Sequence, residues 1–403
     1  MNSRERVLAA LRHQSPDRVP LDLGGIESSG LTGIASARLR KHLGLAPGKL
    51  RVFDTMQQIV VIDDDLRERF EIDTVPLLLE PRRWKPGELA DGTPCEIPEK
   101  WNPEREPDGD RVVRDADGTV VSRMPAGGFY FEPCSPPLAA VTQPSELERH
   151  ADVINAFDWP GYVDESMSDL GARARKLFEE TERAVVANLG VHLLAGGQIL
   201  RGFENFMVDL LANKTLAHAL LERLTDAYVA RADAYLDAVG KYVQVVVIND
   251  DLGTQQGPML SLECYREMIL PYQRRLFAHI KSRTDAALLL HSCGSVDRFI
   301  PLLIEAGVDA LNPVQVSAAG MDTARLKREF GRDLTFWGGG CDTQHVLPHG
   351  SPAEIEAEVA RRVRDLAPGG GFVFTQVHNV QPDVPPENVV AMIEAFHNVR
   401  DRG

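Results

Sequence analysis

The stretch that decides the fold reads VQVVVIND at residues 243–250 and AALLLHSCG at residues 286–294. Each part begins with a short apolar run, and a helical pattern at about 262–282 separates the two. A strand, a helix and a second strand in this order predict parallel strands joined by a crossover helix. Each apolar run ends in polar residues, so we expect these side chains to meet at one edge of the sheet.

The same alternation extends in both directions along the chain. The eight strand candidates are residues 19–25, 73–79, 184–190, 243–250, 286–294, 309–314, 334–340 and 371–379. Helical patterns accompany them, including one predicted over residues 53–71. Eight strand–helix units predict an α/β fold of the (β/α)8 TIM-barrel type. The alternative, a doubly wound sheet, would place GxGxxG near the first strand, where this chain has GGIESSG.

Residues 80–140 interrupt the alternation. They are rich in Pro, Gly, Asp and Trp and contain short pieces such as CEIP and TVVSRM. This composition is typical of hairpins and loops rather than of a strand–helix unit. We therefore expect a single barrel domain over residues 1–403, with residues 80–140 inserted after its second strand.

The charge balance narrows the class of protein. The 403 residues include 44 Lys and Arg against 59 Asp and Glu, a net charge of −15. This argues against a nucleic-acid-binding protein and against a polybasic membrane anchor. The five widely spaced cysteines form no disulfide framework, and the first residues lack the apolar core of a signal peptide. A soluble cytoplasmic enzyme is the expectation.

Polar side chains gather at the predicted carboxyl ends of the strands, where barrels carry their chemistry. His291 and Cys293 follow one apolar run and are two residues apart, so in an extended segment they face the same side. Imidazole and thiolate are both good zinc ligands. A third ligand would come from another strand end, either His378 or Cys341, with the aspartates at 250 and 251 as possible oxygen donors. Packing is the alternative for Cys341, since a single cysteine usually behaves as a small buried hydrophobe.

Two adjacent acids, Asp250 and Asp251, end another predicted strand. Neighbouring strand residues point in opposite directions, so one carboxylate should face the site as a proton carrier, and Asp250 is our choice. The other carboxylate would cap a turn or a helix. The candidate substrate-binding residues are Asn188, Arg201, Asn249, Asn312 and Gln315.

These residues stand in segments that resemble the uroporphyrinogen decarboxylase superfamily over nearly the whole chain. The opening RERVLAALRHQSPDRVPLDLGG is similar to that of the family, as are DDLGTQQGPMLSLECYREMILPYQRRL and HSCGSVDRFIPLLIEAGVDALNPVQ. FWGGGCDTQHVLPHGSPAEIEAEV and GGGFVFTQVHNVQPDVPPENVVAM complete the set. The resemblance implies a TIM barrel and leaves two branches of activity open.

One branch decarboxylates porphyrinogens and carries an arginine-rich segment after the first strand. Here that place reads IESSGLTGIASARLR, which has no counterpart of the paired arginines. The other branch comprises zinc methyltransferases linked to corrinoid proteins, whose zinc is held by His-x-Cys and a later Cys. The resemblance places His291 and Cys293 on the first two ligands and His378 on the third. A histidine in place of that cysteine lowers the negative charge on the metal and favours Lewis-acid chemistry on oxygen.

The resemblance therefore implies a zinc-dependent enzyme that moves a methyl group between a small O- or S-methyl substrate, or folate, and a corrinoid carrier on a separate protein. One alternative is a zinc-dependent lyase or decarboxylase acting on a small carboxylate or polyol. Another is a non-catalytic partner of a corrinoid protein. A homodimer would be unsurprising for the superfamily.

Overall fold

A parallel sheet of seven strands forms the centre of the protein. The computed structural model describes residues 1–156 and 163–402. The strands follow one another in the order β16-β15-β14-β13-β12-β11-β4. Their bounds are β4 Thr74–Leu77, β11 Ala184–Asn188, β12 Val245–Asn249, β13 Ala287–His291, β14 Ala310–Asn312, β15 Thr335–Trp337 and β16 Phe372–Val373. Each of these strands falls within a segment predicted from the sequence.

The segment around Leu21 occupies the eighth strand position and closes the barrel. Leu21 forms a parallel bridge with Phe374, just after β16. On its other side the Leu21 carbonyl accepts a hydrogen bond of 2.8 Å from the backbone N–H of Asp73, just before β4. The chain therefore has the (β/α)8 TIM-barrel fold that the sequence predicts.

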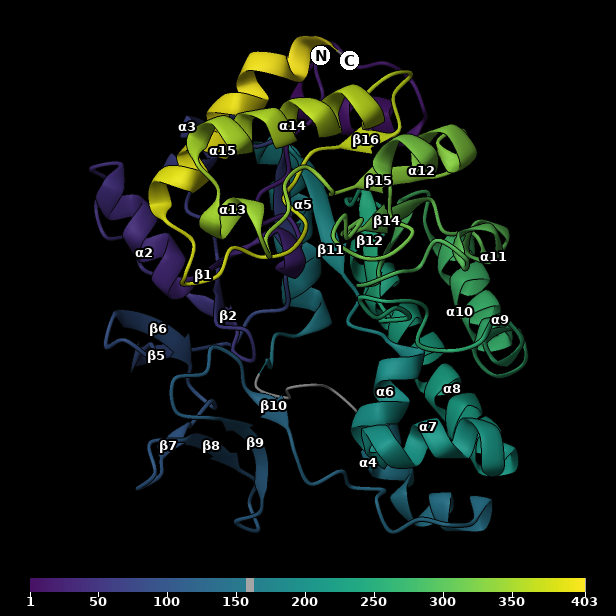
Figure 1. The fold of residues 1–403 in the computed structure, drawn as a ribbon. Coiled ribbons are helices and arrows are strands. Elements are labelled where there is room, and N and C mark those ends of the chain that lie inside the picture. The colour runs from purple at the N-terminus through teal and green to yellow at the C-terminus, as the bar shows by residue number, and fades with distance from the viewer. Residues whose placement is uncertain (157–162, 403) are drawn as a thin grey trace.

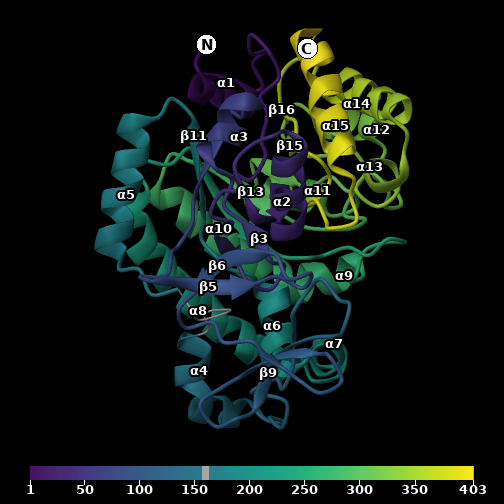
Figure 2. The same cartoon turned by 90° about the vertical axis from the view of Figure 1, so that its left-hand side faces the viewer.

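The amino-terminal end of the barrel is closed by helix α1 (Ser3–Leu11), whose Val7 and Ala10 pack against Val245 and Leu289 inside the barrel. Both chain termini lie at this end, whereas strands β5 to β10 lie at the opposite end (Figures 1 and 2). The open end of the barrel is thus the end at which the strands finish.

The outer layer consists of helices, which pack on the sheet or on one another. The longest is α8 (Lys214–Val239), which carries eleven buried residues. Besides α1 and α8, the α-helices of four or more residues in the described part of the chain are α2 Gly33–His42, α3 Asp64–Arg69, α4 Ala151–Asn155, α5 Met167–Glu180, α6 Leu193–Arg201, α7 Phe203–Ala212, α10 Leu270–Arg283, α11 Ile300–Ala306, α12 Thr323–Phe330, α13 Val346–His349, α14 Pro352–Leu366 and α15 Pro386–Val399. Among the described residues, no helix is both long and apolar enough to span a bilayer.

The prediction of a helix over residues 53–71 is wrong for most of that range. Strands β2 (Val52–Asp54) and β3 (Ile59–Val60) form a hairpin, and only α3 is helical. The Asp54 carboxylate accepts hydrogen bonds from the backbone N–H groups of Met56 and Gln57, which fixes the turn. A side chain that bonds its own backbone in this way competes with helix formation.

Residues 80–140 form the hairpins that the sequence predicts. Strands β5 (Trp84–Glu88) and β6 (Pro94–Pro98) make one antiparallel pair. A second sheet has the order β10-β9-β8-β7, with bounds β7 Glu104–Arg105, β8 Arg111–Arg114, β9 Val120–Met124 and β10 Glu132–Pro133. This insertion lies at the open end of the barrel (Figure 1).

Candidate active site

His291, Cys293 and His378 come together at the open end of the barrel. One ligand atom from each residue lies within 4.8 Å of the other two. Cys293 Sγ is 3.4 Å from His291 Nε2, and the two imidazole rings have centroids 5.5 Å apart. Residues 87 positions apart along the chain thus offer two nitrogens and one sulfur to a common point, a donor set suited to zinc. We call these three residues the HCH cluster.

The orientation of His291 is fixed by Asn312 at the end of β14. The Asn312 amide nitrogen donates to the Trp337 carbonyl at 2.8 Å, so its oxygen must face the other way. That oxygen lies 2.6 Å from His291 Nδ1 and accepts a second hydrogen bond from Ser28 Oγ at 2.7 Å. Nδ1 therefore carries the proton, and Nε2 keeps its lone pair for the HCH cluster. This arrangement is the usual support of a metal-binding histidine.

Burial determines the protonation of the other two members of the cluster. Burial, helped by the charge of His291, lowers the pKa of His378 to about 4, so this ring is neutral at pH 7. Burial and the nearby Asp251 carboxylate raise the pKa of the Cys293 thiol. A bound cation would oppose both effects on Cys293 and stabilise its thiolate.

Cys341 lies apart from the cluster as a fully buried residue of the hydrophobic core. Burial raises the pKa of its thiol. Of the two third ligands that the sequence left open, the structure thus brings His378 to His291 and Cys293, and it places Cys341 in packing.

A cavity of about 310 Å³ adjoins the cluster, and we call it the metal-side cavity. His291 and His378 form part of its wall, with Asn249, Asp250 and Asp251 from the end of β12. Five of the ten predicted site residues therefore line one cavity. Tyr130 of the insertion reaches the same region, because its hydroxyl lies 3.5 Å from the side-chain oxygen of Asn379, beside His378.

The two adjacent aspartates are used differently. The Asp250 carboxylate accepts hydrogen bonds from the backbone N–H groups of Leu194 and Ala195, at the start of α6, and from the Gln273 amide at 2.9 Å. Asp251 instead lies with Oδ1 at 3.9 Å from His291 Nε2 and accepts a hydrogen bond of 2.8 Å from the Cys293 backbone. The geometry favours Asp251 over our choice of Asp250 as the carboxylate that acts at the cluster.

Three predicted substrate-binding residues hold other protein groups in place. Both ends of the Asn312 amide are taken, as described above. The Gln315 oxygen accepts from the Gly294 backbone at 2.7 Å and so supports the loop that carries Cys293. Arg201, the third of these residues, has its guanidinium buried against Asp209 at 2.8 Å and donates to the Leu138 and Ala139 carbonyls. These contacts hold α6 against its neighbours, and they occupy the groups with which Arg201 would bind a substrate.

Glu27 lies in the loop that follows the barrel segment around Leu21, and it is a site residue that the sequence did not predict. Its Oε2 accepts a hydrogen bond of 2.6 Å from Asn188, and the Asn249 side chain is a second partner. Burial, together with the nearby Asp54 carboxylate, raises the pKa of Glu27 from 4.5 to about 8. The available signal was a single carboxylate in the otherwise Gly- and Ser-rich stretch GGIESSG.

A second cavity, of about 400 Å³, lies on the other side of Glu27. Glu27 and Asp54 line it together with Asn188, Asn249 and Tyr235, and we call it the acid-pair cavity. Glu27, Gln57, His192 and Asn249 line both cavities. The two spaces therefore adjoin, with Glu27 at their boundary.

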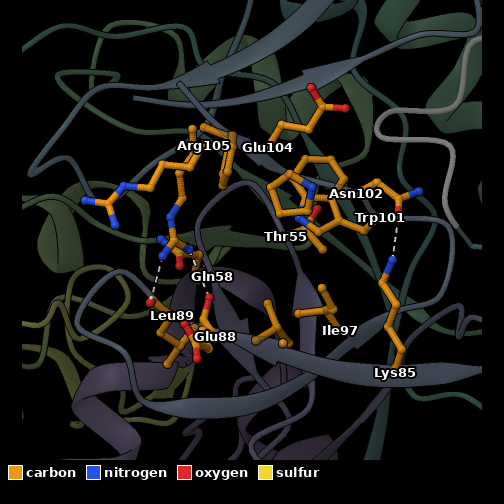
Figure 3. A pocket seen from close by; sticks show the side chains of 15 residues that line it. Thr55, Gln58, Lys85, Glu88, Leu89, Ile97, Trp101, Asn102, Glu104 and Arg105 are labelled. Atoms are coloured by element: carbon orange, nitrogen blue, oxygen red, sulfur yellow. Dashed lines mark hydrogen bonds between the residues drawn. The ribbon is translucent and has the colours of Figure 1, made fainter. Parts of the chain in front are cut away.

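A third pocket, of about 450 Å³, belongs to the insertion (Figure 3). In it Lys85 donates to the Asn102 side chain, and Arg111 donates to the Glu88 and Leu89 carbonyls. The turn between β2 and β3 separates this pocket from the barrel, since Thr55 and Gln58 line it while Asp54 and Gln57 line the acid-pair cavity.

The comparison with solved structures agrees with the fold. A methyltransferase from Methanosarcina mazei superposes with a TM-score of 0.59 over 99% of both chains, at 16% sequence identity. At that identity the likeness is one of fold alone.

Two curated relatives are uroporphyrinogen decarboxylases. A uroporphyrinogen decarboxylase from Alkalilimnicola ehrlichii is 29% identical over 187 residues, which are 45% of this chain and 48% of that protein. The chain thus spans about half the length of that relative. A uroporphyrinogen decarboxylase from Pectobacterium carotovorum is 26% identical over 68% of this chain and 74% of its own length.

The family model described as uroporphyrinogen decarboxylase (URO-D) matches residues 189–399, which contain β12 to β16 and all three members of the HCH cluster. This match covers more than half of the chain, so the protein belongs to the uroporphyrinogen decarboxylase family.

Proposed function

We propose that this protein is a zinc-dependent methyltransferase that moves a methyl group between a small O- or S-methyl substrate, or folate, and a corrinoid carrier on a separate protein. The observation that carries the proposal is the convergence of His291, Cys293 and His378 on one point beside a cavity. The donor chemistry fits zinc, which commonly takes three protein ligands in catalytic sites and keeps a further position for substrate.

The composition of the donor set favours an oxygen substrate. Two neutral imidazoles and one thiolate leave a net positive charge on a divalent ion. When bound, zinc would supply Lewis-acid polarisation of the atom that carries the methyl group. Asn312 holds His291 in the tautomer that this requires, and Asp251 lies close enough to hold a proton or a substrate hydroxyl.

Glu27 supports the same reading. When a methyl group leaves an oxygen as a cation equivalent, the bonding electron pair stays on that oxygen, which then needs a proton. A carboxyl group whose pKa is raised to about 8 carries that proton at pH 7. Glu27 stands at the boundary of the two cavities, and His291 and His378 line the first of them.

The same residues argue against porphyrinogen decarboxylation. The loop after the first strand presents Glu27, and the two arginines of residues 26–40 are engaged elsewhere. Arg38 donates to the Pro382 carbonyl, and Arg40 pairs with Asp63 and Asp65. A site whose loop arginines, Arg38 and Arg40, are engaged elsewhere and whose walls carry buried acids is a poor match for a substrate with many carboxylates.

A zinc-dependent lyase or decarboxylase on a small carboxylate or polyol is the second candidate. The raised pKa of Glu27 favours it as well, because a protonated acid can also deliver a proton to a carbanion or an alkoxide.

The deciding experiment incubates the zinc-loaded protein, without oxygen, with reduced cobalamin and a panel of O-methyl and S-methyl compounds. We expect methylcobalamin to form, as followed by its absorbance, and to depend on Cys293. Cys341→Ser is the matched control and should keep the activity. Release of carbon dioxide or of an eliminated product, with no methylcobalamin, would instead establish the lyase.

A further inference from the structure

The acid-pair cavity contains a polar group that none of the described residues satisfies. Tyr235 of α8 is 1% exposed, and its hydroxyl has no hydrogen-bond partner among the described residues. This side chain lines the cavity; burial raises the pKa of its hydroxyl, and Arg173, Glu165 and Glu27 are the charges that act on it. A buried hydroxyl without a partner destabilises the protein, so it points to a ligand that completes the bond.

The polar side of the cavity offers both donors and acceptors. Glu27 accepts from Asn188 and Asn249, and Asp54 accepts from Gln57. Burial raises the pKa of both carboxyls, so the pair holds a proton at neutral pH and presents one O–H donor. A ligand hydroxyl can donate to these carboxyls or accept from the O–H, and a ligand ether oxygen can accept from the O–H.

The positive and negative charges that face the cavity are about equal. The acid pair carries about one negative charge, since two carboxylates this close do not both ionise readily. Arg231 supplies one positive charge, while its guanidinium also donates to the Gly190 carbonyl at 3.1 Å. His192 is neutral, because burial lowers its pKa to about 4. An anionic ligand would meet Asp54, and a cationic ligand would meet Arg231.

The opposite side of the cavity is apolar, with walls formed by Phe53, Met56, Leu78, Leu79 and Met167. A volume of about 400 Å³ is within the usual range for pockets that hold small organic molecules. The cavity thus matches a molecule of one ring or of similar size, with an apolar body and polar atoms on one side.

We propose that the acid-pair cavity binds the body of the substrate, and that this body is an uncharged molecule with an apolar framework and hydroxyl or ether oxygens. The inference rests on the proposed function in one respect, since it directs the methyl-bearing end past Glu27 toward the HCH cluster. Tyr235 and Glu27 bind the substrate oxygens, and the balanced charge of the cavity favours an uncharged ligand over a carboxylate or an ammonium ion.

Three probes of equal size and different charge test the inference by calorimetry on the full chain, without turnover. They are 4-methoxybenzyl alcohol, 4-methoxybenzoate and 4-methoxybenzylamine. We expect the alcohol to bind about tenfold tighter than either ion. Tyr235→Phe should weaken binding of the alcohol about fivefold, as expected for one lost hydrogen bond. The matched control is Tyr242→Phe, a partly buried tyrosine just beyond α8, which should bind like the wild type.

Tighter binding of the benzoate or of the amine would overturn the inference, as would failure of all three probes to bind. Asp54→Asn tests the charge argument separately and should narrow the preference for the alcohol over the benzoate; an unchanged preference would remove Asp54 from it. Binding of the alcohol without any methyl transfer would leave this pocket established and would refute only the proposed reaction.

Discussion

His291 Nδ1 lies 2.6 Å from the side-chain oxygen of Asn312, and this contact turns His291 Nε2 toward Cys293. Adjacent strands β13 and β14 place the two residues directly opposite each other in parallel register. The barrel itself therefore aligns the histidine, and no flexible loop is needed to orient it.

Asn312→Ala should weaken zinc binding without unfolding the protein. The variant leaves His291 Nδ1 without its acceptor, so the ring is free to rotate and to change tautomer. Loss of such a supporting residue typically costs about 10–100-fold in metal affinity. Competition with a chromophoric chelator measures it. Ser28→Ala, which removes only the second donor to the Asn312 oxygen, is the milder comparison and should have a smaller effect. Unchanged affinity in Asn312→Ala would mean that the contact does not support the metal.

About one zinc per chain should accompany the purified protein, and Cys293→Ser should lose most of it. A serine hydroxyl is a much poorer ligand than a thiolate, and the two histidines alone bind zinc weakly. Elemental analysis of protein produced without added metal measures the content. Cys341→Ser should keep its zinc because Cys341 is packed in the core. Full retention by Cys293→Ser would exclude Cys293 as a ligand.

The barrel and the HCH cluster were predictable for the same reason. Apolar runs such as AVVAN and ALLLH are buried on both faces, which is the signature of a parallel sheet, and the polar residue that ends each run must lie at one rim. His291 and Cys293 follow from that rule together with the two-residue period of an extended chain.

What the sequence did not reveal depends on contacts between distant segments. Burial raises the pKa of Glu27, and the nearby Asp54 carboxylate adds to the effect, but Asp54 lies in a stretch that was predicted to be helical. Nothing in the sequence indicates that Arg201 pairs with Asp209, because Asp209 lies on a different helix, α7. Which of two adjacent aspartates faces the cluster depends on the local path of the chain after β12.

Uroporphyrinogen should not be decarboxylated by this protein. Arg38 and Arg40 are held by other groups, and the loop after the first strand presents an acid instead. Anaerobic incubation with the porphyrinogen, followed by chromatographic analysis of the number of carboxyl groups, tests this. Stepwise loss of carboxyl groups at a catalytic rate would contradict the argument, whatever the metal content.

Asp250→Asn and Asp251→Asn should have different effects. The Asp250 carboxylate accepts hydrogen bonds from the backbone at the start of α6 and from the Gln273 amide. An asparagine at this position would place its own NH2 group against one of these donors and lose that hydrogen bond. We expect a loss of about 1–3 kcal/mol in the free energy of unfolding. Asp251→Asn should fold normally and lose about 10²–10⁴ in turnover if this carboxylate moves the proton. Denaturation and single-turnover assays of both variants separate the roles. Full activity in both variants would mean that Asp250 and Asp251 have structural roles only.

Glu27 should make the protein less stable as the pH rises. Its pKa is raised in the folded state, from 4.5 to about 8, so folding favours the protonated carboxyl. The unfolded chain loses this proton near pH 4.5, and the folded protein keeps it until about pH 8. The free energy of unfolding should therefore fall across that window, by a few kcal/mol, and then level off.

Glu27→Gln removes this dependence while it keeps the shape and one donor of the protonated acid. Chemical denaturation of the metal-free protein at about pH 5 and pH 9 measures the difference. We expect the variant to be more stable than the wild type at the higher pH, and nearly equal to it at the lower pH. The other titratable or charged groups at this cavity are Asp54, His192, Arg231 and Tyr235. Glu358→Gln is the control for the loss of a buried carboxylate elsewhere, because Glu358 is paired with Arg362 on α14. Parallel stability profiles for the wild type and Glu27→Gln would mean that Glu27 is ionised in the folded protein, and its role as a proton donor would be lost with that result.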